Sequence, residues 1–156
     1  MAEVLFYHLT ETPLEGALPP MLEASMTRGW RVVVRLGSPE RAEALNAHLW
    51  SYRDDSFLPH GGPGDAAPDR QPIYVTGGDE LPNAPDVLML ADGAGATPAQ
   101  MAALMRTCIL FDARDADAVA AARLRWKEVT AAGLKAVYWK QENGKWNKAS
   151  ESAAKP

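Results

Sequence analysis

The sequence predicts an α/β protein in which a mostly parallel sheet lies between two layers of helices, a three-layer arrangement. Three observations predict this class. Short runs rich in valine, isoleucine and leucine alternate with stretches of helical spacing, most of these runs are apolar throughout, and a hairpin sequence stands near the C-terminus. Strands that are apolar on both faces are typical of parallel sheets buried under helices, and a hairpin adds an antiparallel edge. The chain has 156 residues, enough for one conventional core, so we expect one domain over residues 1–149 and a flexible tail over 150–156.

A change of spacing near the N-terminus indicates the first strand and helix. Val4–Leu9 is an apolar and aromatic run closed by Thr10–Pro13, which is typical of a short strand and its turn. Apolar residues at helical spacing follow over Leu18–Thr27, with Pro19 and Pro20 near the start. Because proline is favoured in the first turn of a helix, the sequence predicts a helix that begins at about these prolines.

The next two elements are a buried strand and a capped helix. Trp30–Leu36 is β-branched and nearly continuously apolar, so we expect it to be a central strand. Ser38 and Pro39 have the form of an N-cap and a first-turn proline, which predicts a helix that runs to about Trp50. Residues 61–72 are rich in glycine and proline and are expected to form a loop.

The middle of the chain predicts three strands and a short helix. Ile73–Thr76 and Val87–Leu90 are apolar runs with the length of strands. Thr97–Gln100 has the form of a capping box with proline at the first helical position, so a helix is expected as far as about Met105. Cys108–Phe111 is a further strand, and its cysteine is expected to be a buried thiol that acts as a small apolar side chain.

The longest helical pattern covers residues 116–132, and a hairpin follows it. Gly133 is placed as the C-terminal stop of this helix. Residues at core-facing spacing are Val119, Ala122, Trp126 and Val129. Two strands, Lys135–Lys140 and Lys145–Lys148, flank an Asn143-Gly144 pair, which is the strongest short hairpin sequence.

Charge and apolar patterning exclude several classes of protein. The chain has 16 Lys and Arg against 20 Asp and Glu, a net charge of −4, and a pI of about 5.4. That is the wrong sign for general electrostatic affinity for duplex DNA. The sequence contains a single cysteine, no apolar run long enough for a membrane span, and an N-terminus unlike a signal peptide. We therefore expect a cytoplasmic protein without a membrane partner.

Motifs for nucleotide, metal or nucleophile chemistry are missing. The sequence has no phosphate-loop motif, and the two glycines in Asp92–Ala96 are not completed by a third glycine at the required spacing. It has no nucleophile-elbow motif, and its three histidines lie in separate predicted elements without metal-ligand spacing. We therefore predict no catalytic, cofactor-binding or metal-binding residue, although an enzyme is unsupported rather than excluded.

An aromatic cluster stands in otherwise polar sequence at residues 49–61. Large apolar side chains lie in and just after the predicted helix end, beside the loop rich in proline and glycine: Trp50, Tyr52, Phe57 and Leu58. They either complete the core at a corner or form a partner surface with a polar rim. The second alternative is favoured for Phe57 and Leu58, because a loop has few ways to bury two large apolar residues at once.

A basic pair stands on the longest predicted helix. Arg123 and Lys127 are four residues apart, so they share a helix face on which like charges repel by a few tenths of a kcal/mol. They are either part of a solvated face that complements the helix dipole or an anion site, in which the arginine binds a carboxylate with its forked donors. Composition alone favours the solvated face.

Four segments together resemble the chi subunit family of bacterial DNA polymerase III holoenzyme. They are LWSYRDDSFLPHG at 49–61, YWKQENGKW at 138–146, VLFYHL at 4–9 and ARLRWK at 122–127. The similarity runs from about residue 3 to 149, and the combination is fairly specific, whereas each segment alone is weak. The resemblance implies a nucleotide-binding-like (Rossmann-like) α/β fold that binds no nucleotide, in agreement with the missing glycine motif.

The resemblance also implies a function without catalysis. Proteins of this family are accessory subunits of the clamp loader. They bind its small psi subunit and, separately, the acidic C-terminal tail of single-stranded DNA-binding protein. The chain would thus bridge the polymerase machinery to the coated template in DNA replication and touch DNA only indirectly. A net negative charge suits that role.

The resemblance assigns residues to both partners. The psi contact corresponds to Phe57, with Trp50, Leu58, Pro59 and His60 nearby. The acidic tail corresponds to Arg123 and Lys127, which raises the anion-site interpretation above the solvated face.

Two rival functions come from other classes. One is a small α/β enzyme that uses the crevice at the carboxyl ends of the strands. The other is a direct binder of single-stranded DNA, with bases stacked on the hairpin rings Tyr138, Trp139 and Trp146 between Lys140, Lys145 and Lys148. The simpler alternative for the hairpin, which we favour, is a sheet edge that its lysines protect against aggregation.

Overall fold

The centre of the structure is a sheet, seen in a computed structural model that describes residues 2–51, 59–65, 67–143 and 145–152. Its strands are β1 (Glu3–Leu9), β2 (Val32–Arg35), β3 (Ile73–Thr76), β4 (Val87–Leu90), β5 (Arg106–Asp112), β6 (Lys135–Glu142) and β7 (Lys145–Ser152). They form a 7-stranded sheet in the order β3-β2-β4-β5-β1-β6-β7. Neighbouring strands are parallel except β6 and β7, which form an antiparallel edge. The predicted sheet is therefore confirmed.

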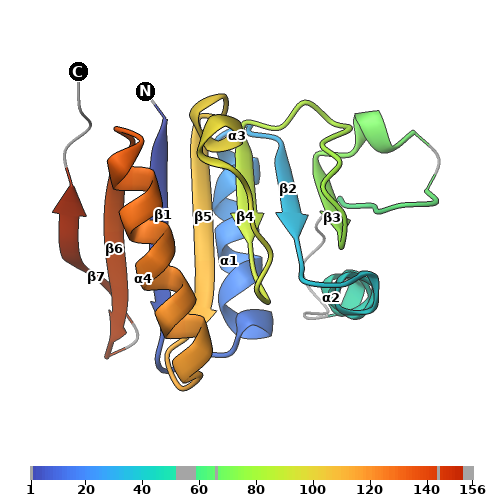
Figure 1. The fold of residues 1–156 in the computed structure, drawn as a ribbon. Coiled ribbons are helices and arrows are strands. Elements are labelled where there is room, and N and C mark those ends of the chain that lie inside the picture. The colour runs from blue at the N-terminus through green and yellow to red at the C-terminus, as the bar shows by residue number, and fades with distance from the viewer. Residues whose placement is uncertain (1, 52–58, 66, 144, 153–156) are drawn as a thin grey trace.

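Helices cover both faces of the sheet and complete three layers (Figure 1). They are α1 (Leu14–Thr27), α2 (Pro39–Ser51), α3 (Pro98–Ala102) and α4 (Ala116–Ala131), and a short 3-10 helix covers Pro68–Arg70. Helices α1 and α2 pack on one face through residues such as Leu18 and Leu45. Helices α3 and α4 pack on the other face through residues such as Met101 and Ala122. The cover on both faces explains why β2, β3 and β4 are buried along their whole length.

Helix α1 begins at Leu14, so Pro19 and Pro20 lie inside it rather than in its first turn. A proline inside a helix removes the donor to the carbonyl four residues earlier. For Pro19 that carbonyl belongs to Glu15, and His48 Nε2 on α2 donates a hydrogen bond to it at 3.0 Å. The predicted start was wrong because the neighbouring helix supplies the donor that the proline lacks.

Strand β2 is buried but not central. It lies between β4 and the edge strand β3, and only Val32–Arg35 of the predicted run are paired. Arg35 itself is buried, and its guanidinium donates to the carbonyls of Gly95 and Asp79 at 2.8 and 2.9 Å. An apolar run indicates that a strand is buried on both faces of the sheet. The position of that strand in the strand order depends instead on how the connections between strands cross the sheet.

The capping signals of two helices are confirmed, whereas one helix end differs. Ser38 Oγ accepts a backbone N–H of the first turn of α2 at 3.2 Å. Thr97 and Gln100 form the predicted reciprocal capping box at the start of α3. Helix α3 ends at Ala102 rather than near Met105, because the chain turns there and enters β5 one residue after that methionine.

The C-terminal hairpin is longer than predicted. Asn143 adopts a φ of 54°, as the Asn-Gly turn requires. Strand β7 continues to Ser152, beyond residue 150 where we expected the tail to start, and an irregularity in pairing occurs between Tyr138 and Trp139. Residues 153–156 lie outside the described part of the chain.

The contact between α1 and α2 predicts a coupled change in stability. We expect His48→Ala to lower the free energy of unfolding by about 1–2 kcal/mol, because the Glu15 carbonyl loses its donor in a partly buried place. In a Pro19→Ala background the loss should be smaller, since the new backbone N–H binds the same carbonyl. Urea unfolding of the four proteins of this double-mutant cycle measures the coupling. Equal losses in both backgrounds would contradict this account of the proline.

Candidate functional site

Helix α4 is held against the sheet by an aromatic contact near its middle. Asp115 caps the helix, and its carboxylate accepts two backbone N–H groups of the first turn at 3.0 and 3.3 Å. Trp126 packs on Phe6 of β1 and on Tyr138 of β6, with ring centroids 5.3 and 6.2 Å apart. These contacts fix the rotation of the helix about its axis and so determine which other residues face solvent.

This rotation places the basic residues of α4 on two flanks. A helix turns about 100° per residue, so Arg123 and Lys127 lie to one side of Trp126 and Arg125 to the other. Arg125 reaches the loop after β4, where a side chain at Gly95 would overlap its guanidinium. Arg123 and Lys127, which we call the basic flank, are exposed. Neither forms an ion pair with another described residue.

The sheet brings three side chains into a row on the face that α4 covers. The parallel register places His8 of β1 beside Phe111 of β5 on one side and Lys140 of β6 on the other. His8 stacks on Phe111 with centroids 5.1 Å apart and an angle of 16° between the rings. Tyr138 Oη and His8 Nδ1 share a hydrogen bond of 2.8 Å, whose direction is set by the tautomer of the imidazole.

Charges from two elements act on this row. Burial lowers the pKa of His8, and the positive charges of Lys140 and Arg123 lower it further. Burial raises the pKa of the Tyr138 hydroxyl, and Arg123 acts against that rise. Lys140 is the neighbour of His8 on β6, and the charge of Arg123 on α4 acts on the same ring.

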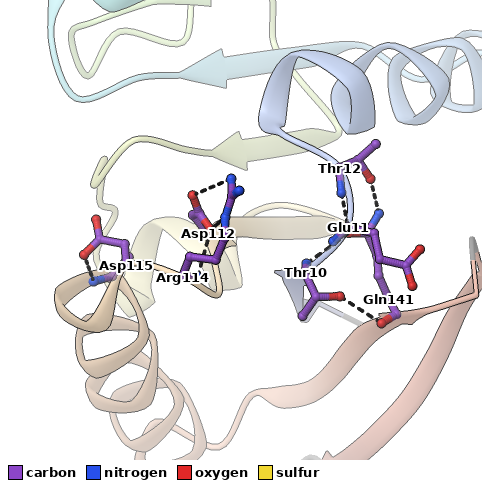
Figure 2. A network of polar contacts seen from close by, with 8 residues as sticks. Thr10, Glu11, Thr12, Asp112, Arg114, Asp115 and Gln141 are labelled. Carbon is purple, nitrogen blue, oxygen red and sulfur yellow. Dashed lines mark hydrogen bonds and ion pairs between the residues drawn. The ribbon is translucent and has the colours of Figure 1, made fainter.

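Gln141, the residue after Lys140, ties β6 to the loop that follows β1 (Figure 2). Its Oε1 accepts the backbone N–H groups of Thr10, Glu11 and Thr12 at 3.1, 3.0 and 3.3 Å. Its backbone carbonyl accepts the Thr10 hydroxyl at 2.9 Å, and its Nε2 donates to Thr12 Oγ1. In nucleotide-binding sheets of this kind the loop after the first strand offers its N–H groups to phosphate. In this chain the side-chain oxygen of Gln141 accepts hydrogen bonds from these N–H groups.

A crevice of about 510 Å³ lies at the carboxyl ends of β1, β4 and β5, where α/β enzymes bind ligands. Carboxylates dominate its charged lining: Glu15, Asp92, Asp112, Asp115 and Asp117, with Arg41. Arg41 pairs with Asp92 and Glu15 at 3.3 and 3.7 Å. Arg114 holds Asp112 at 3.2 Å (Figure 2) and lowers the pKa of that carboxyl. This excess of negative charge is unfavourable for a phosphate-bearing substrate.

Part of the aromatic cluster forms a surface contact at the end of α2. Trp50 is 55% exposed, and its ring packs on His60 with centroids 4.1 Å apart. His60 is buried, and its Nε2 hydrogen-bonds the carbonyl of Asn46 at 3.1 Å. Pro59 beside it is half-buried. Trp50 thus lies on the surface rather than at a core corner. The other candidates of this cluster lie outside the described residues: Tyr52, Phe57 and Leu58.

The hairpin does not present its aromatic rings on one surface. Tyr138 lies on the α4 face, whereas Trp139 and Trp146 lie on the α1 face, because successive residues of a strand point to opposite sides. Trp146 packs edge-on against Tyr7 at 5.0 Å, and Lys148 Nζ lies 5.8 Å from the Trp139 ring centroid. The idea of bases stacked on all three rings was therefore wrong. The prediction of a lysine-bearing edge agrees with β7 as the edge strand.

Three residues of this region did not stand out in the sequence. His8 lies in an apolar run, and the hairpin pattern explained Lys140 and Gln141 without a further role. Their importance arises from contacts such as Tyr138 to His8, which join residues about 130 positions apart. Only an expectation that β1 and β6 are neighbours would have brought them together.

Three further expectations concern the described residues. No helix among them is long and apolar enough to cross a membrane. They contain no group of three or more His, Cys, Asp or Glu side chains arranged to hold a metal ion. Cys108 is buried as predicted, and burial raises the pKa of its thiol to about 12.

These features define an α/β protein with a mostly parallel sheet and an exposed cationic flank that lies apart from the acidic crevice. The family model described as DNA polymerase III chi subunit, HolC, matches residues 1–137. The chain belongs to this family, the chi subunits of DNA polymerase III.

A curated relative has the same family name. It is the "Probable DNA polymerase III subunit chi" of Rickettsia prowazekii (strain Madrid E), which is 30% identical over 90 residues. These cover 58% of this chain and 54% of the relative, so the match spans about half of that protein's length. The family match ends in β6 at residue 137, so it includes the basic flank but neither Lys140 nor Gln141.

The contacts of Gln141 predict a measurable contribution to stability. Gln141→Ala should lower the free energy of unfolding by about 1–2 kcal/mol, because three backbone donors exchange a fixed acceptor for water. Glu142→Ala, at the next residue of the same strand, should change it by less than about 0.5 kcal/mol. Urea unfolding curves compare the two. Similar losses would show that the loop after β1 does not depend on Gln141.

Proposed function

We propose that this protein bridges the clamp loader of DNA polymerase III to single-stranded DNA-binding protein on the template. One contact is with the psi subunit of the clamp loader, or with a substitute for it. The other is with the acidic C-terminal tail of single-stranded DNA-binding protein. Family membership supports a place in the polymerase assembly, and the two partner contacts are the proposal.

The basic flank is the observation that carries the proposal. Arg123 and Lys127 lie four residues apart on an exposed helix face, where neither is neutralised by an ion pair with another described residue. An acidic peptide that binds there relieves their repulsion and forms charge-assisted hydrogen bonds, with Arg123 able to make two parallel bonds to one carboxylate. Leu124, the residue after Arg123, is 61% exposed and adds apolar contact area.

Net charge fits an indirect contact with DNA. The chain carries −4, so a local basic flank attracts an acidic protein segment while the molecule as a whole does not attract a phosphate backbone. The proposed role needs no catalysis, cofactor or metal. In this role the protein only holds two partners together.

The surface around Trp50 is proposed for the psi contact. An exposed tryptophan that rests on a buried histidine is a rigid apolar group with little conformational entropy to lose on binding. Pro59 and His60 follow directly after Phe57 and Leu58 in the sequence, and His60 packs on Trp50. These five residues are the proposed interface.

Titration of the tail peptide tests the basic flank. Arg123→Ala should weaken binding by about 1.5–3 kcal/mol, the range for hydrogen bonds to charged groups, and Arg123→Lys should recover only part of that loss. Binding should be strongly dependent on salt. Stability should hold or rise slightly, because a like-charge pair has been removed. Isothermal titration at low and high salt measures the effect.

Arg125→Ala is the matched control for this titration. It removes the same charge from the same helix but on the flank that faces Gly95, so tail binding should stay close to wild type. A single-stranded oligonucleotide titrated in parallel tests the direct DNA-binding alternative. Unchanged peptide binding in Arg123→Ala, or equal losses in Arg123→Ala and Arg125→Ala, would remove this function from the flank.

Binding of psi tests the second surface. Phe57→Ala and Trp50→Ala should each weaken binding, with Phe57→Ala costing 2 kcal/mol or more, roughly the scale of an interface hot spot. Both variants should keep melting curves close to that of wild type. A loss of about 3–5 kcal/mol of stability in Phe57→Ala would instead place that ring in the core. Pull-down with psi and thermal melts together decide.

A further inference from the structure

A third cation stands beside the basic flank and comes from a different element. We propose that Lys140 and the His8–Tyr138 pair belong to the same anion-binding surface as Arg123, and that this surface holds an acidic peptide more tightly below neutral pH. The inference rests on the proposed function of the basic flank. It adds two things to it: a further binding residue from the hairpin, and a dependence on protonation.

Lys140 is available for such a contact. It is only partly exposed, its strand neighbour on the same face is His8, and it forms no ion pair with another described residue. The acidic groups at the same edge have partners of their own: Arg114 holds Asp112, and the Asn147 amide donates to Glu142 at 3.4 Å. A carboxylate bound between α4 and β6 therefore meets Arg123 on one side and Lys140 on the other.

His8 lies between those two cations and can supply a third charge. The elements packed against it contribute Arg123 from α4, Tyr138 and Lys140 from β6, and the uncharged Phe111 from β5. In the free protein burial and then the two cations lower the pKa of His8 and so disfavour a proton on the ring. A bound acidic segment reverses this balance, because its carboxylates neutralise Arg123 and Lys140 and favour a proton on the imidazole.

Protonation also fixes the direction of the contact with Tyr138. While His8 is neutral, the hydrogen bond between the Tyr138 hydroxyl and Nδ1 can run either way, according to the tautomer of the ring. Once Nδ1 carries a proton it becomes the donor, so the hydroxyl oxygen must accept and its hydrogen becomes available to a carboxylate. Binding and protonation are therefore linked: each strengthens the other by the same factor.

Gln141 keeps the parts in register. It is adjacent to Lys140 and holds the loop that begins two residues after His8. The C-terminal ends of β1 and β6 thus present His8 and Lys140 side by side whether or not a peptide is bound. The surface is pre-formed, so little ordering opposes binding.

The test uses the full-length chain and a synthetic acidic peptide with several aspartates, an apolar last residue and a free C-terminal carboxylate. Fluorescence anisotropy of the labelled peptide gives Kd at low salt, at about pH 7.5 and about pH 5.5. At the higher pH, Lys140→Ala should raise Kd about two- to fivefold, the range for partly exposed charge pairs. Lys148→Ala, a lysine on the opposite face of the hairpin, should leave it unchanged.

The pH series isolates the histidine. The Kd of wild type should fall about two- to fivefold from the higher to the lower pH, roughly the effect of one added partly exposed charge. His8→Gln should remove that fall, and Tyr138→Phe should reduce it. If His8→Gln does not fold, Tyr138→Phe carries the test, because it changes one hydroxyl and leaves the histidine in place. Thermal melts at both pH values verify folding.

The outcomes separate this inference from the function it rests on. If Arg123→Ala weakens binding but Lys140→Ala matches Lys148→Ala, or if His8→Gln and Tyr138→Phe keep the wild-type pH response, the inference is wrong and the function of the basic flank stands. If the peptide does not bind wild type, or if Arg123→Ala binds as wild type does, both are wrong.

Discussion

The packing of Trp126 between Phe6 and Tyr138 is the contact on which the surface of this protein depends. It joins α4 to β1 and β6 at one place and fixes the rotation of the helix. With Trp126 turned inward, Arg123 lies on the side of α4 from which its charge acts on Tyr138 of β6, and Arg125 reaches the loop after β4. A helix rotated by one residue would direct the same cations into different surroundings. The aromatic core thus determines where the charge is presented.

The ends of β1 and β6 show how a fold typical of nucleotide-binding proteins is used differently. The N–H groups after β1, which could receive a phosphate in such a fold, bind the oxygen of Gln141 instead. The neighbouring crevice is lined by carboxylates. Exposed or partly exposed cations lie elsewhere, on the basic flank of α4 and at Lys140 of β6. In our proposal, the same sheet supports a surface for an acidic protein segment.

A bridging protein must hold two partners without one excluding the other, and the layers of this fold allow that. Trp50 lies in the last turn of α2, which packs on one face of the sheet, whereas Arg123 lies on α4, which packs on the other (Figure 1). The whole sheet lies between the two helices. The proposed contacts with psi and with the acidic tail are thus far apart in the architecture, and neither needs the sheet to move. Affinity for one partner is expected to be independent of the other.

The sequence by itself determined the local features: the buried strands, the caps at Ser38 and Thr97, the inward stripe of α4, and the closeness of Arg123 to Lys127. Each is encoded within one or two turns of chain, where spacing and capping chemistry act directly. Only the tertiary structure decided the position of β2 in the strand order, the location of Pro19 inside α1, and the row formed by His8 and Lys140. These depend on which distant segments become neighbours. The pattern of apolar residues in the sequence indicates that a residue is buried, but it does not indicate which other segment of the chain covers it.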